Sequence, residues 1–177
     1  MILTGIADEA GDGIDSQIAA TKALGWKHIE ARFLSVGEHE KGSIHEIPEE
    51  AFSLAVQALD EAGIKVCGIG STIGNWAHPI TDPYEITIGE VNRCIDRMKR
   101  LDSSIVRIMS YSIIEDENEN DHEDQLFEER VKRLKDIKNR FEDNGITPVH
   151  ENCMNFGGMS VSHALKLQNE IPDLKWV

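Results

Sequence analysis

The sequence contains no apolar run that approaches the ~20 residues needed to span a membrane, and no early apolar segment is flanked by basic residues. We therefore expect neither a membrane span nor a secretory leader, and a cytoplasmic location. Positive charge is also scarce, since 18 basic residues face 32 acidic ones and the net charge is −14. Such a surface repels nucleic-acid phosphates and anionic membranes, so a small molecule is the expected partner.

The sequence is also low in cysteine and in phosphate-binding loops. The three cysteines, Cys67, Cys94 and Cys153, are odd in number and far apart, and they form no CxxC pair. A disulfide framework is therefore not expected, and a reducing compartment fits. No GxGxxG or Walker A loop follows the first expected strand, which disfavours a nucleotide-binding fold.

The chain does contain a repeated alternation of β-branched runs and helical apolar spacing. Strands are predicted to begin near residues 2, 27, 64, 104, 147 and 174, and helices are predicted over residues 14–24, 48–62, 83–101, 123–144 and 160–170. This order predicts parallel strands joined by right-handed crossovers, as in a doubly wound sheet or a (β/α)8 TIM barrel. The missing nucleotide loop favours the barrel.

The chain is short for a whole barrel. It holds about five βα units and the start of strand six in 177 residues, whereas eight units and roughly 250 residues are typical. We therefore expect residues 1–177 to form a single domain, the N-terminal portion of a longer barrel. An acidic run over residues 115–124 carries seven carboxylates, and we interpret it as a solvated loop leading into a helix rather than as a cation site.

Active sites of parallel barrels lie at the carboxyl ends of the strands. The polar residues expected there are Asp8, Glu9, Glu30, Arg32, Ser71, Arg107, Ser110, His150, Glu151 and Asn152. Glu151 is the strongest candidate, because a carboxylate at a strand end can bind a hard divalent ion or take a proton from a carbon beside a carbonyl. The spacing alone is equally compatible with a carboxylate that caps the next helix.

The other candidates each have two interpretations. Arg107, within an apolar strand, needs a partner or a role: it binds a substrate oxygen or phosphate, or it pairs with an acid such as Glu30, which we slightly favour. His150 and Glu151 should point to opposite faces of their strand, which favours a packed histidine over a ligand. Asn152 orients Glu151, contacts substrate or holds the turn, and Trp76 covers a sugar-like ligand or packs.

Four segments together resemble the xylose isomerase-like barrels, a superfamily of sugar-phosphate isomerases and epimerases that also includes endonuclease IV-type enzymes. They are "GIADEAGDGIDSQIAATKALGWKHIEAR", "EAGIKVCGIGSTIG", "IVRIMSY" and "HENCMNFGGMS". The last is the most specific, because Glu151 matches the family's metal-binding glutamate on strand five. The resemblance implies a divalent metal, Mn²⁺ or Mg²⁺ ahead of Co²⁺ or Zn²⁺, and an acid–base role for Glu151 alongside a second carboxylate.

By this resemblance the protein is a metal-dependent sugar or sugar-phosphate isomerase or epimerase that acts through an enediolate, with a dehydratase as a close variant. The substrate-binding candidates are Arg107, His150, Asn152, Glu30 and Trp76. In this family the other metal ligands lie on strands six to eight. Residues 1–177 alone are therefore not expected to bind metal tightly or to turn over substrate. An endonuclease IV-like enzyme and a non-catalytic carbohydrate-binding barrel are the alternatives, and a homo-oligomer is left open.

Overall fold

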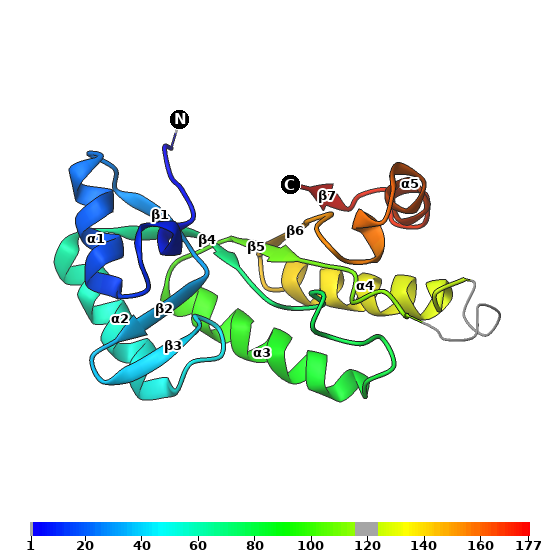
Figure 1. The fold of residues 1–177 in the computed structure, drawn as a ribbon, viewed down its shortest axis with the longest axis horizontal. Coiled ribbons are helices and arrows are strands. Elements are labelled where there is room, and N and C mark those ends of the chain that lie inside the picture. The colour runs from blue at the N-terminus through cyan, green and yellow to red at the C-terminus, as the bar shows by residue number, and fades with distance from the viewer. Residues whose placement is uncertain (1, 116–123) are drawn as a thin grey trace. The chain divides into compact units, whose positions relative to one another are not determined.

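The computed structural model describes residues 2–115 and 124–177, so most of the acidic run lies outside the described residues. The chain divides into two compact units (Figure 1). The first comprises Met1–Ser71 and Arg93–Val106, and the second comprises Thr72–Asn92 and Arg107–Val177. Strand β5 (Ile105–Ile108) and helix α3 (Tyr84–Arg100) each contribute residues to both units.

The first unit contains most of the elements of the N-terminal third of the chain. In chain order they are η1 (Ala7–Ala10), α1 (Ile14–Ala23), β1 (His28–Ala31), β2 (Phe33–Val36), β3 (His39–Ser43), α2 (Glu49–Ala62) and β4 (Lys65–Gly70). Strand β1 pairs in parallel with β4, and β5 follows β4 in the sheet. The predicted parallel order is therefore confirmed here.

Helix α2 shows how the sequence specifies one of these elements. Pro48 precedes its first residue, and Gly63 ends it in the left-handed conformation that glycine tolerates. An apolar stripe runs along the helix, and Phe52, Ala55 and Leu59 within it are buried. Burial of this stripe stabilises the helix more than local propensity does.

Two predictions for the first unit are wrong. Residues 2–7 form no continuous strand: Ile6 makes an isolated parallel bridge with Glu30, and the chain then turns into η1. The turn brings Asp8 and Glu9 to Arg32, which competes with continued strand pairing. The region expected to be a loop before α2 instead contains the antiparallel β2–β3 hairpin, whose turn includes Gly37 at a φ of 57°.

The second unit contains α4 (Phe127–Glu142), β6 (Thr147–His150), η2 (Phe156–Gly158), α5 (Val161–Glu170) and β7 (Lys175–Trp176). Within it the strand order is β5-β6-β7, and β6 pairs in parallel with β7. Leu134, Ile137 and Phe141 of α4 are completely buried, close to the predicted stripe. The predicted elements of this unit are confirmed to within a few residues.

No helix in the described part of the chain is both long enough and apolar enough to cross a membrane.

Candidate active site

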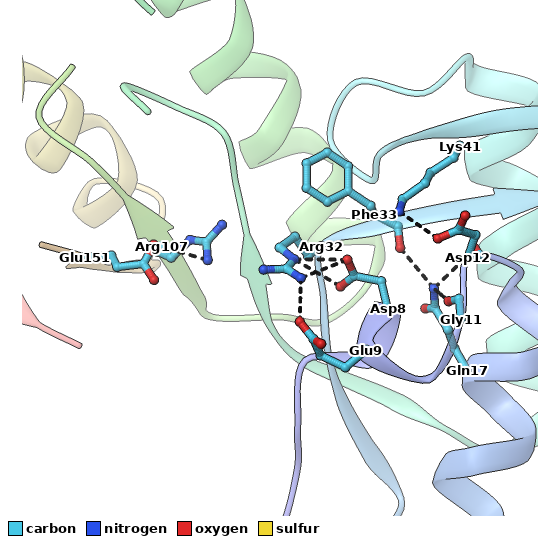
Figure 2. A network of polar contacts seen from close by, with 10 residues as sticks. All are labelled: Asp8, Glu9, Gly11, Asp12, Gln17, Arg32, Phe33, Lys41, Arg107 and Glu151. Carbon is cyan, nitrogen blue, oxygen red and sulfur yellow. Dashed lines mark hydrogen bonds and ion pairs between the residues drawn. The ribbon is translucent and has the colours of Figure 1, made fainter. Parts of the chain in front are cut away.

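Glu151 lies where β6 ends in the second unit. Its backbone N–H donates to the carbonyl of Ile108, the last residue of β5, at 3.0 Å. Its carboxylate Oε2 lies 3.3 Å from Nη1 of Arg107, which is itself on β5 (Figure 2). The Arg107 side chain is 10% exposed and the Glu151 side chain is 29% exposed. Two of the predicted site residues are thus brought into direct contact. The favoured pairing of Arg107 with Glu30 stays a prediction.

The residue before Glu151 points away from this contact. His150 is completely buried, with its ring edge-on to Trp176 at a centroid distance of 4.5 Å. Gly157 lies so close that a Cβ there would be 2.6 Å from the imidazole. Burial lowers the pKa of His150 to about 4, so the ring is neutral at pH 7. The predicted packed histidine agrees with this environment, which gives no support to a substrate contact.

The loop that follows Glu151 is held by a residue that the sequence analysis missed. Asn155 is completely buried, and its amide donates to the backbone carbonyls of Glu151 at 2.8 Å and Cys153 at 2.6 Å. Its Oδ1 accepts from the hydroxyl of Ser110 and from the N–H of Gly157 at 3.1 Å. Asn152 is exposed, and its three possible roles, orienting Glu151, contacting substrate or holding the turn, stay predictions.

The loops that follow β4 and β5 are also tied together in this unit. The N–H of Met109 donates to the carbonyl of Ile73 at 3.0 Å. Gly74 has a φ of 66°, and a Cβ there would be 2.4 Å from the carbonyl oxygen of Met109, so only glycine allows this approach. Trp76, in the same segment, is 56% exposed. Its predicted role as a ligand cover stays a prediction.

Arg130 of α4 anchors the end of β5 from the helix side. It is completely buried and donates to the carbonyls of Ser110 at 2.6 Å, Ser112 at 2.7 Å and Gln125 at 2.6 Å. Burial lowers its pKa to about 10, so it stays charged at pH 7. Because backbone carbonyls accept all these bonds, Arg130 stabilises the segment that follows β5. Its position inside an amphipathic helix gave no signal of this role.

The first unit has its own polar network at the strand ends (Figure 2). Nε of Arg32 donates to both carboxylate oxygens of Asp8 at 3.1 Å, and Nη2 donates to Glu9 at 2.9 Å. Glu30 and Arg32 share a face, as predicted, since a Cβ on Gly70 would lie 3.2 Å from Oε1 of Glu30 and 3.3 Å from Cβ of Arg32. Glu30 is half-buried, and its role in substrate binding stays a prediction.

The donor set can be compared with what a divalent cation needs. A carboxylate oxygen is the ligand type that Mg²⁺ and Mn²⁺ prefer, and Glu151 offers one. Across residues 2–115 and 124–177, however, no group of three His, Cys, Asp or Glu side chains is placed to hold an ion. One carboxylate paired with an arginine is not a metal site, so the described residues do not by themselves fit the ion.

Parallel strands with intervening helices and a carboxylate at a strand's carboxyl end define an α/β protein of the barrel class. The family model described as xylose isomerase-like TIM barrel matches residues 18–177. The chain therefore belongs to the xylose isomerase-like TIM barrel family. The comparison with curated proteins found no match.

Solved structures show the same fold. A xylose isomerase-like TIM barrel protein from Mycobacterium smegmatis, in complex with magnesium, is 13% identical with a TM-score of 0.65, covering 99% of this chain and 62% of that one. D-allulose 3-epimerase from Methylomonas sp., in complex with D-allulose, is 12% identical with a TM-score of 0.64, covering 99% and 60%. The 3-keto-D-glucoside 4-epimerase from E. coli is 11% identical with a TM-score of 0.63, covering 99% and 66%. The chain thus spans about three fifths of the length of these barrels.

Proposed function

We propose that this chain belongs to an isomerase or epimerase that moves a proton at the carbon beside the carbonyl of a sugar or sugar phosphate, with Glu151 as the proton carrier. The observation that carries the proposal is the Glu151 carboxylate, partly exposed at the end of β6 and facing the Arg107 guanidinium at 3.3 Å. Membership of the family and the fold shared with two sugar epimerases support the substrate class.

The two side chains have complementary chemistry for this reaction. A carboxylate held near the C–H bond takes the proton, and negative charge then develops on the neighbouring substrate oxygen. A guanidinium offers up to five N–H donors and keeps its charge, so Arg107 can bind that oxygen and stabilise the enediolate. Delivery of a proton to the opposite face of the carbon, from a second acid, gives the epimer. Delivery to the neighbouring carbon, with a proton moving between the two oxygens, gives the isomer.

A divalent ion, Mn²⁺ or Mg²⁺ ahead of Co²⁺ or Zn²⁺, is part of the proposal on the strength of the family. Glu151 would contribute one oxygen ligand, and the remaining ligands would have to come from residues other than those described. The chemistry that such an ion would supply is Lewis-acid activation of the substrate carbonyl.

Solvent exchange tests the function directly. The intact protein is incubated in D₂O with a panel of ketoses and ketose phosphates, with Mn²⁺ or Mg²⁺ added, and deuterium at the carbon beside the carbonyl is followed by NMR. We expect incorporation with at least one member of the panel, and its suppression by a chelator would assign the ion. A complete lack of incorporation across the panel would refute the proposal, and release of water from the substrate would identify the dehydratase variant.

DNA is the substrate of the endonuclease IV-type branch, and the net charge of −14 disfavours it because phosphate binding needs compensating cations.

A further inference from the structure

The backbone of Glu151 is fixed on both sides of its Cα. The N–H is held by Ile108 of the neighbouring strand at 3.0 Å. The carbonyl is held at 2.8 Å by the side-chain amide of Asn155, four residues further along the chain. A side chain can be aimed reproducibly only from a fixed backbone, and Asn155 supplies the second of the two restraints.

The amide of Asn155 uses all of its hydrogen-bonding capacity. Its two N–H groups reach the carbonyls of Glu151 and Cys153, and its oxygen accepts from Ser110 and Gly157. Complete burial makes each of these bonds costly to lose, because water is not available to replace it. The network joins the loop after Glu151 to the end of β5 through Ser110.

The loop needs such a restraint because its backbone is conformationally demanding. Met154 has a φ of 42°, a region that residues other than glycine seldom adopt. A Cβ on Gly158 would lie 2.4 Å from the carbonyl oxygen of Asn152. Other side chains cannot replace the amide: aspartate has the same shape but no N–H donors, and serine offers a single donor on a shorter stem.

From this arrangement we propose that Asn155 is a positioning residue for catalysis, which sets the direction of the Glu151 carboxylate by clamping the loop that follows it. The proposal rests on the proposed function of Glu151. Asn155 acts through the backbone and need not touch substrate. Its loss should therefore lower the rate of proton transfer more than it weakens substrate binding.

The test replaces Asn155 by aspartate in the intact protein and measures two quantities. Hydrogen–deuterium exchange of the peptide that spans residues 151–158 reports the clamp without reference to activity. Steady-state kinetics, normalised to folded protein, report the consequence for catalysis. We expect faster amide exchange in that peptide, a kcat lowered about 10- to 100-fold and a KM within about twofold of wild type, because small misplacements of a catalytic group are costly in rate.

Two further variants keep the experiment interpretable. Asn144→Asp is the matched control, since the Asn144 amide donates to Arg140 at the exposed end of α4; it should change neither quantity. Ser110→Ala retains both amide donors of Asn155 and removes the hydroxyl that donates to its Oδ1 and accepts from the N–H of Gly157 at 2.8 Å. It should lower kcat severalfold, and it provides the test if Asn155→Asp does not fold.

The outcomes separate the two proposals. An unchanged kcat per folded molecule, in a protein whose wild type is active, would overturn the positioning role even if amide exchange increased. Unchanged amide exchange would overturn the clamp itself. A wild type that exchanges no substrate proton would overturn the proposed function, and the positioning role with it, whatever the loop does.

Discussion

Two arginines at strand ends, one in each unit, face carboxylates in different ways. In the first unit Arg32 contacts two carboxylates, and that of Asp8 is only 4% exposed. In the second unit Arg107 contacts the carboxylate of Glu151, which is 29% exposed. The first contact uses Nε and Nη2 of the guanidinium, whereas the second joins Nη1 to a carboxylate oxygen at 3.3 Å.

On the function proposed above, the difference separates a structural ion pair from a reactive one. A nearly buried carboxylate that accepts a hydrogen bond from an arginine is stabilised where it is, and removing its cation leaves it without solvent to replace the bond. A partly exposed carboxylate keeps access to a ligand. The comparison therefore predicts that changes at Arg32 act on folding, whereas changes at Glu151 and Arg107 act on the reaction.

The largest effect is expected for Glu151→Gln, which keeps the shape of the side chain and removes its ability to take a proton. We expect kcat for solvent exchange to fall roughly 10²- to 10⁴-fold, the range that general acid–base catalysis contributes. The midpoint of thermal unfolding should change little, since the lost ion pair is partly exposed. Kinetics in D₂O and a thermal melt measure both quantities.

Glu9→Gln is the matched control from the first unit, because the side chain of Glu9 is 74% exposed and contacts Arg32. It should leave the exchange rate at the wild-type value. Equal rate losses in the two variants would remove the distinction between the two arginine contacts.

His150, the last residue of β6, lies on the opposite face from Glu151, and we expect it to affect stability rather than the reaction. Its pKa is lowered from 6.5 to about 4 by burial, so the unfolded chain binds the proton more readily than the folded protein. The stability that comes from keeping it neutral is present above about pH 6.5 and is lost as the pH falls toward 4, by about 3 kcal/mol. Urea unfolding between pH 7 and 4 should show this loss in wild type and a shallower decline in His150→Leu; identical slopes would contradict it.

Arg32→Met tests the structural side of the comparison. Methionine keeps part of the apolar stem but leaves the nearly buried carboxylate of Asp8 without its cation. We expect the free energy of unfolding to fall by roughly 2–3 kcal/mol, measured by urea denaturation at pH 7. Combining Arg32→Met with Asp8→Asn should recover part of the loss, and no recovery would show that Asp8 is not the cause.

Much of the fold was predictable because the spacing of apolar residues and the residues that begin and end helices indicate the same elements along most of the chain. In α2, Pro48, the apolar spacing of Phe52 and Leu59, and Gly63 all indicate the same helix, and the structure confirms it. The strand predicted over residues 2–7 was wrong because an apolar run does not reveal whether a neighbouring strand pairs with it. The β2–β3 hairpin was missed because β3, with the sequence HEKGS, carries charged and polar residues where a strand usually carries apolar ones.

The site was predictable only as far as strand ends could be located. Placing Glu151 at the end of β6 required the strand boundary alone, and alternation correctly sent His150 to the other face. The partner of Arg107 and the clamp by Asn155 depend on contacts between residues 44 to 45 positions apart, which local patterns do not encode. The two asparagines of this loop show the limit, since the sequence singled out Asn152 and only the structure reveals that Asn155 is the buried one.

The smallest effect on stability is expected for Arg107→Met, the counterpart of Arg32→Met in the second unit. The carboxylate that it leaves behind, Glu151, is partly exposed and can be hydrated. The free energy of unfolding should therefore change by less than about 1 kcal/mol. Because we propose that Arg107 stabilises the charge that develops on a substrate oxygen, kcat/KM should fall about tenfold, equivalent to ~1.4 kcal/mol of lost transition-state stabilisation. A stability loss as large as that of Arg32→Met, with kcat/KM unchanged, would make both arginines structural and would remove Arg107 from the site.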